Sequence, residues 1–106
     1  MSAKDHYMEG LMKIGANELD DAVAAFQKAV EADPGFVMGY LGWSQALDRS
    51  GKVDEAIVQA KRAIEVAPKE PLAFTSLSRL LQQKGMIPEA EEAMARSQAL
   101  QREEEE

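Results

Sequence analysis

The chain has 106 residues, which is enough for one compact domain and too few for two independent cores. It has no cysteine, so disulfides, thiolate metal sites and cysteine nucleophiles are excluded. The formal net charge is -7, and Lys and Arg are scattered among acids. This argues against nucleic acid as a partner, because phosphate binding needs a basic stripe.

The sequence shows no signal for export or membrane insertion. Residues 1–10 have no apolar run behind their lysine, and no later run approaches about 18 uninterrupted apolar residues. We therefore expect a cytoplasmic protein that binds neither membrane nor nucleic acid. An acidic chain of this kind favours a basic or apolar protein partner.

Apolar residues recur at helical spacing along most of the chain, and they predict six helices and no strand. The expected helices cover residues 3–15, 19–32, 37–49, 53–66, 71–84 and 87–102. The last four residues, 103–106, are all glutamate, and we expect a disordered, solvated acidic tail there. The prediction is a single all-α domain over residues 1–102.

Glycine, asparagine and proline mark the ends of these helices. Asn17, Gly51 and Gly85 follow the first, third and fifth helices, where a left-handed backbone is most easily adopted by Gly and next by Asn. Pro71 and Pro88 lie in the first turns of helices, where proline is tolerated. The turn residues therefore agree with the helical periodicity.

The chain repeats itself with a period of 34 residues. Alanine recurs at this interval as Ala22, Ala56 and Ala90. Aligning residues 18–34 with 52–68 gives five identities in 17 positions, where chance gives about one. The chain is therefore built from three helix-turn-helix units, over about residues 3–36, 37–70 and 71–102.

The repeating unit resembles that of the tetratricopeptide repeat family, which is a 34-residue helix-turn-helix with large, small and proline residues at fixed places. The middle unit carries the resemblance through Tyr40, Trp43, Ala56, Gly51, Ala63 and Pro68. The first unit matches at Gly10, Ala22, Phe26, Ala29 and Pro34, and the third at Phe74, Leu77, Gly85 and Ala90. The departures are His6 in the place of Tyr40 and Phe74, Ser97 in the place of an alanine, and Arg102 in the place of the closing proline.

The resemblance implies a right-handed α-solenoid of three stacked units without a separate capping helix. Each unit buries its apolar face only against its neighbours, so stacking supplies the core. We expect Trp43 in that core and His6 half-buried. Met94 and Leu100 on the last helix have no covering helix, which suggests homo-oligomerisation through the terminal helices as an alternative function.

The resemblance also implies that the first helix of each unit lines a concave groove for a partner segment. The proposed groove residues are Tyr7, Leu11, Met38, Leu41, Gln45, Arg49, Leu72, Thr75 and Arg79, with Lys4 and Gln82 as further inward-facing positions. Met8 and Ile14 lie on the same helix, and we expect them to pack in the core instead. The main hypothesis is a protein-binding adaptor, scaffold or assembly chaperone that holds a partly apolar segment.

One branch of the family binds C-terminal carboxylates of chaperones through lysine, asparagine and arginine. Those places are occupied here by Tyr7, Leu11, Gly42, Leu72 and Ser76. None of them is cationic, so this clamp is not expected. With one histidine, no cysteine and no phosphate-binding loop, the sequence predicts neither an enzyme nor a cofactor or metal site.

Overall fold

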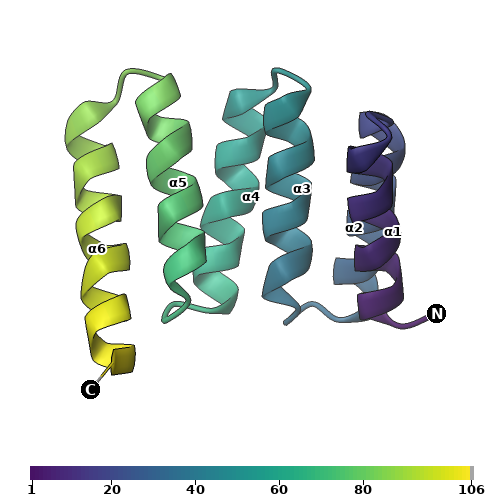
Figure 1. Ribbon diagram of the computed structural model, residues 1–106, viewed down its shortest axis with the longest axis horizontal. Helices are drawn as coiled ribbons and strands as arrows, with labels where there is room; N and C mark the ends of the chain where they lie inside the picture. The colour runs from purple at the N-terminus through teal and green to yellow at the C-terminus, as the bar shows by residue number, and fades with distance from the viewer. Residues whose placement is uncertain (106) are drawn as a thin grey trace.

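The computed structural model describes residues 1–105, and this part of the chain folds into six helices without a strand. They are α1 (Ala3–Gly15), α2 (Leu19–Ala32), α3 (Val37–Arg49), α4 (Val53–Val66), α5 (Pro71–Gln83) and α6 (Ile87–Glu105). The helices follow one another across the molecule, each antiparallel to the next (Figure 1). Every helix packs on its neighbour in sequence, and α3 also contacts α1, as α5 contacts α3. The predicted all-α repeat architecture is confirmed.

The last helix is longer than the sequence predicted. It continues through Glu105, whereas we expected it to end at residue 102 and to be followed by a disordered tail. Glutamate is a good helix former, and residues 99–105 contain no glycine or proline that would end the helix. Residues 103–105 are therefore helical, and Glu106 lies outside the described residues.

The turns between paired helices adopt the backbone that the sequence predicted. Asn17, Gly51 and Gly85 have φ angles of 59°, 80° and 75°. After each of them, the next amide donates to the carbonyl five residues earlier, at 2.8 or 2.9 Å. These bonds satisfy carbonyls at the helix end, which is the usual function of a left-handed residue at this place.

The start of α1 is fixed by a reciprocal capping box. The hydroxyl of Ser2 accepts from the Asp5 amide, and the Asp5 carboxylate accepts from the Ser2 amide, both at 3.1 Å. The bond from the Ser2 backbone lowers the pKa of Asp5 below its usual value of 3.8. The cap therefore stabilises α1 above that pH and is lost as the pH falls through the lower pKa of the folded state.

Within each unit the two helices approach closely at the repeated alanine. Ala22, Ala56 and Ala90 are all fully buried. The hydroxyl of Ser44 donates to the Ala56 carbonyl at 2.8 Å, and 34 residues later Ser78 donates to the Ala90 carbonyl at 2.7 Å. The sequence period is thus repeated in a hydrogen bond that ties α3 to α4 and α5 to α6.

The interface between the first and second units is filled by one aromatic ring from α2. Phe26 is fully buried, and its ring lies between Gly10 of α1 and Gly42 of α3. A Cβ atom would lie 2.5 Å from the ring at Gly10 and 2.4 Å at Gly42, so only glycine fits at either place. Ala46 of α3 completes this cluster.

The interface between the second and third units uses the opposite arrangement. Ala60 of α4 occupies the position of Phe26, and Leu80 of α5 occupies the position of Ala46, each 34 residues later. The large side chain therefore comes from α2 at the first interface and from α5 at the second. Both residues of the second pair are buried in the largest core cluster.

His6 is half-buried as the sequence predicted, whereas Trp43 lies at the edge of the core and not within it. Trp43 is half-buried and packs against the core clusters at both unit interfaces. His6 is half-buried on α1. In the equivalent place of the second unit, the Tyr40 hydroxyl donates to the Pro34 carbonyl at 3.2 Å.

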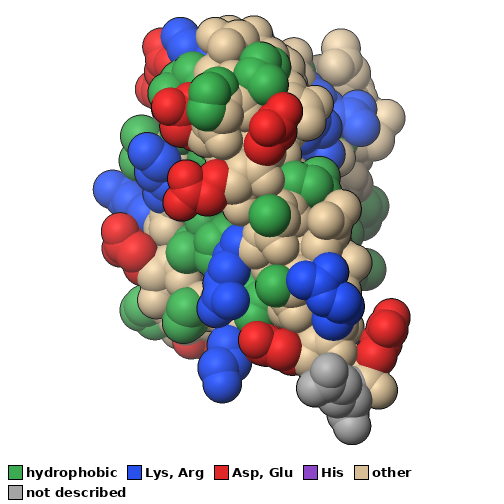
Figure 2. All heavy atoms as spheres, turned by 90° about the vertical axis from the view of Figure 1, so that its left-hand side faces the viewer, with side chains coloured by type: hydrophobic (Ala, Val, Ile, Leu, Met, Phe, Trp, Pro, Cys, Tyr) green, Lys and Arg blue, Asp and Glu red, His purple; other side chains and the backbone are tan. Residues whose placement is uncertain are grey.

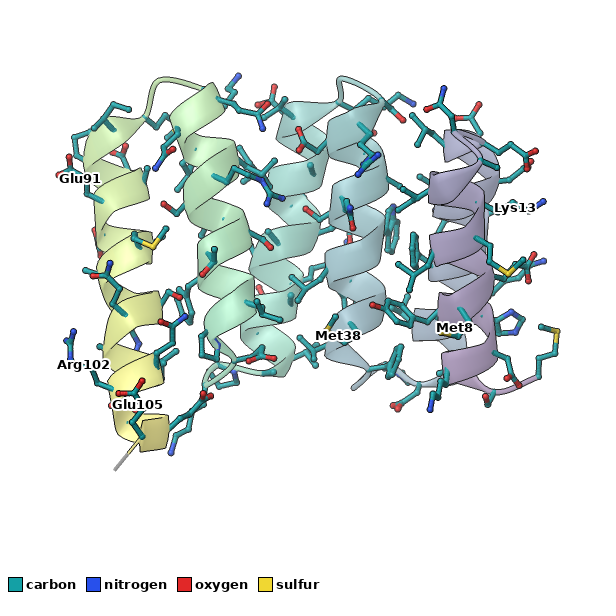
Figure 3. All side chains as sticks on the ribbon, in the orientation of Figure 1. Met8, Lys13, Met38, Glu91, Arg102 and Glu105 are labelled. Carbon is teal, nitrogen blue, oxygen red and sulfur yellow. The ribbon has the colours of Figure 1, made fainter. Side chains whose placement is uncertain are left out.

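The outer face of α6 is more polar than the sequence suggested. Leu100 is buried, so the expectation that it lies uncovered is wrong, while Met94 is half-buried. Helix α2 packs on α3 through Val23, Phe26 and Val30. The equivalent residues of α6 are Glu91, Met94 and Gln98. Glu91 and Arg102 project away from the molecule (Figure 3). Helix α6 thus covers its own unit.

Every helix within residues 1–105 is too short or too polar to cross a lipid bilayer.

Candidate binding groove

A cleft of about 210 Å³ lies between α1, α3 and α5. Its lining residues are Tyr7, Met38, Leu41, Gly42, Ser44, Gln45, Leu72, Ser76 and Arg79. All of them belong to the first helix of a unit. The cleft is called the groove below.

The structure brings together most of the residues that we expected in the groove. Those among the lining residues are Tyr7, Met38, Leu41, Gln45, Leu72 and Arg79. Leu11, Arg49 and Thr75 are not among them. Three small residues that we did not assign to the groove, Gly42, Ser44 and Ser76, also line it. The 34-residue spacing of Gly42 and Ser76 was the available signal for them.

Tyr7 is held at the α1 end of the groove by other aromatic rings. Its ring centroid lies 5.9 Å from that of Phe26 and 5.5 Å from that of Phe36, in tilted and edge-to-face arrangements. Such arrangements are favourable for aromatic pairs and restrict the ring. Met38 lies on the side of α3 that faces α5 (Figure 3). The groove therefore has a fixed aromatic wall and an adaptable methionine.

Leu41 and Leu72 occupy different depths of the groove. Leu41 is only 8% exposed and packs with Ala63 and Ala73, so it forms the floor. Leu72 of α5 is 50% exposed and forms the wall. An incoming side chain would contact Leu72 without displacing the core.

Among the lining residues of the groove, Arg79 alone is charged. Its side chain is exposed, and the ion pairs of the described residues join other groups, Lys13 with Glu18 and Lys84 with Asp54. A guanidinium group binds carboxylates through planar, paired hydrogen bonds. The groove therefore suits an apolar side chain with a neighbouring acidic group.

Thr75 does not face the groove, so our assignment of it was wrong. Its hydroxyl lies 2.7 Å from the Ser97 hydroxyl, and both hydroxyls lie within hydrogen-bond distance of the Pro71 carbonyl, at 3.2 and 3.1 Å. Thr75 is thus turned toward α6. Ser97, in the place of an alanine, is buried but satisfied by these partners.

We expect Ser97→Ala to lower the free energy of unfolding by only about 0.5–1.5 kcal/mol, because Thr75 can still donate to the Pro71 carbonyl. Urea unfolding followed by circular dichroism measures this change. Gln98→Ala, on the exposed face of the same helix, serves as the control and should change stability by less than about 0.5 kcal/mol. A loss above about 3 kcal/mol for Ser97→Ala would contradict this account.

The prediction that Met8 and Ile14 of α1 pack in the core is right for Ile14 and wrong for Met8. Ile14 is buried, as expected, but Met8 is 50% exposed and does not pack in the core. Met8 corresponds to Gly42, which lies against Phe26 of α2, and among the described residues no helix covers that face of α1. The helical pattern alone could not distinguish a covered face from an uncovered one.

The described residues carry no cluster of three or more His, Asp or Glu side chains that could hold a metal ion. The groove itself contains no His, Asp or Glu among its lining residues. The lining offers apolar contacts, hydrogen-bonding groups and one guanidinium group.

Residues 7–71 and 41–104 each match the family model for the tetratricopeptide repeat. The chain belongs to this family. Tetratricopeptide repeat (TPR) domains are protein-binding modules that are typically non-catalytic. No curated protein matches the chain significantly.

Solved TPR structures share the fold at low sequence identity. A crystal structure of MamA has a TM-score of 0.90 at 22% identity, over 97% of this chain and 60% of that one. The Yersinia enterocolitica chaperone SycD, in complex with a peptide of the translocator YopD, has a TM-score of 0.85 at 25% identity, over 92% and 74%. The second TPR of Spaghetti (RPAP3), bound to the HSP90 peptide SRMEEVD, has 0.87 at 17%, over 94% and 93%. The chain thus spans about 60% of the length of that MamA chain.

Proposed function

We propose that this TPR domain is a non-catalytic adaptor, scaffold or assembly chaperone that holds a short segment of a partner protein in the groove. The segment would carry an apolar anchor against Leu72 and Met38 and an acidic residue beside Arg79. The observation that carries the proposal is the groove itself, with an exposed leucine and one cation in the same cleft. Recognition through a few side-chain anchors is a common mode of peptide binding.

Structural neighbours support a peptide as the ligand, and the residues of this groove limit the chemistry of that peptide. SycD and the RPAP3 domain were each solved with a partner peptide. Leu72 and Ser76 line the groove of this chain. The carboxylate-binding branch of the family places polar or cationic donors at these two positions. We therefore propose an internal, partly apolar segment and not a C-terminal carboxylate as the ligand.

We expect Leu72→Glu to weaken binding of groove ligands at least about tenfold, because a carboxylate replaces the apolar wall and repels the acidic residue of the ligand. Peptides selected from a random library on the wild-type domain provide the ligands, and fluorescence anisotropy measures their affinity. Leu41→Glu is unsuitable, because it would bury a charge in the floor and destabilise the fold.

Val58→Glu is the matched control for this experiment. Val58 is 47% exposed, close to the 50% of Leu72, and lies on α4 outside the groove. Glutamate already occupies the equivalent position in the third unit, as Glu92. Equal affinity of selected peptides for wild type and Leu72→Glu, with weaker binding to Val58→Glu, would show that the groove is not the binding site.

Self-association is a second candidate, favoured by the exposed methionines of α1. Met8 is 50% and Met12 is 74% exposed. Both lie on the face of α1 that corresponds to the face by which α3 and α5 pack on the preceding unit. Light scattering over a range of concentrations tests it: a strict monomer contradicts self-association. A dimer that Met12→Glu dissociates would support it.

A further inference from the structure

A second and larger cavity, of about 650 Å³, lies on the other side of α5 from the groove, between α4 and α6. Its lining residues are Lys61, Phe74, Leu77, Leu81, Met86, Glu89, Glu92, Ala93, Ala95 and Arg96. It is called the α4/α6 cavity below. Figure 2 looks onto the α6 end, where small hydrophobic areas alternate with acidic and basic side chains.

The preceding unit has a cavity at the equivalent place, between α2 and α4. Its volume is about 340 Å³, and it is lined by Val23, Gln27, Trp43, Leu47, Lys52, Glu55, Val58 and Gln59. Seven of these eight positions recur, 34 residues later, among the lining residues of the α4/α6 cavity. The two cavities are therefore the same feature of successive units, and the larger one also extends to Phe74, Ala95 and Arg96.

Two of the shared positions carry smaller side chains in the α4/α6 cavity. Leu77 occupies the place of Trp43, and Ala93 occupies the place of Gln59. Their smaller side chains occupy less of the cavity than Trp43 and Gln59 do in the preceding unit. Phe74, Leu81 and Met86 provide further apolar walls. A cavity of this size with mostly apolar walls and a few polar groups has the usual properties of a ligand site.

The charged residues of the α4/α6 cavity lie in a fixed order along it. Glu89 and Glu92 come first on α6, and at 1.5 Å per residue Arg96 follows about 6 Å beyond Glu92. Lys61 of α4 also lines the cavity, opposite α6. Because α5 runs antiparallel to both α4 and α6, Lys61 and Arg96 lie toward the end of the cavity that Phe74 lines. None of the four takes part in an ion pair of the described residues.

We propose that the α4/α6 cavity binds one aromatic side chain of a partner polypeptide, in the space that Trp43 fills in the preceding unit. An acidic residue next to that aromatic side chain would lie between Lys61 and Arg96. The site is separate from the groove, so the domain could hold two segments of partner proteins on opposite sides of α5. This inference does not rest on the function proposed for the groove.

Blocked dipeptides test the proposal, with acetyl-Trp-Glu-amide and acetyl-Trp-Lys-amide as the probes. We expect the glutamate probe to shift amide resonances of residues 86–96, none of which lines the groove, in nuclear magnetic resonance titrations of the ¹⁵N-labelled protein. The lysine probe should bind about threefold or more weakly, since exposed charge pairs contribute only modestly. Shifts confined to the groove, or no shifts at all, would overturn the proposal, as would equal binding of the two probes.

Two variants that fill the cavity complete the test. Leu77→Trp restores the residue of the preceding unit, and we expect it to weaken the glutamate probe at least tenfold. Ala93→Gln does the same from α6 and remains informative if the tryptophan variant does not fold. Leu72→Glu should leave the probe-induced shifts of residues 86–96 unchanged, because Leu72 lies in the groove. Unchanged probe affinity in the folded cavity variants would overturn the assignment.

Discussion

Phe26→Ala should lower the free energy of unfolding by about 3–5 kcal/mol, because it empties the space between Gly10 and Gly42. The backbone of α1 and α3 approaches the ring directly at these glycines, so neither position has a side chain that could move in to fill the void. For a domain of this size, a loss of this magnitude is a large part of the total stability. Guanidinium unfolding followed by circular dichroism measures it.

Phe74→Ala is the control for this variant. Phe74 has the same side chain, but it is half-buried at the wall of the α4/α6 cavity, so its removal exposes little new apolar surface. We expect a loss well below that of Phe26→Ala. Equal losses for the two variants, or a loss below about 1 kcal/mol for Phe26→Ala, would contradict the described packing.

Leu80→Ala should lower the free energy of unfolding by about 2–5 kcal/mol, and Ala60→Phe should also destabilise the protein, by about 1–3 kcal/mol through overpacking. The reason is the opposite arrangement of large and small residues at the two unit interfaces. The double variant Ala60→Phe with Leu80→Ala copies the first interface, and we expect it to be more stable than the sum of the single losses implies.

Chemical denaturation of the four proteins in this cycle gives the coupling energy, which we expect to lie between about 0.5 and 3 kcal/mol in the favourable direction. Ser76, in the place of Gly42, limits the recovery, because its Cβ lies where the first interface accommodates the ring. Adding Ser76→Gly should therefore recover more stability. Simple additivity of Ala60→Phe and Leu80→Ala would show that the two residues do not share a space.

Helix positions and turns could be predicted from the sequence because they depend on local features. The 34-residue period is visible in Ala22, Ala56 and Ala90, and the left-handed turns follow from the residues that occupy them. The family resemblance added the order of stacking. The end of α6 was missed because a run of glutamates is compatible with both a solvated helix and a disordered tail.

The candidate site was less accessible to prediction, because it depends on which face of a helix is covered. Thr75 and Leu41 occupy equivalent positions of successive units, yet Thr75 contacts Ser97 and Leu41 lines the groove. Met8 was assigned to the core from its spacing alone, and the face that carries it is uncovered. The α4/α6 cavity was missed because its lining comes from three helices, and Leu77 and Ala93 are recognised as smaller only in comparison with Trp43 and Gln59 of the preceding unit.

The opposite arrangement of large and small residues at the two interfaces also makes the order of the units non-interchangeable. If residues 37–70 were deleted, α2 would meet α5 directly, and Phe26 would face Leu80 and Ser76 in place of Ala46 and Gly42. Two large side chains would then compete for one space. The packing of the core therefore disfavours folds in which repeats are skipped or exchanged, which are possible misfolded states for any chain of similar segments. No charged residue is needed for this effect.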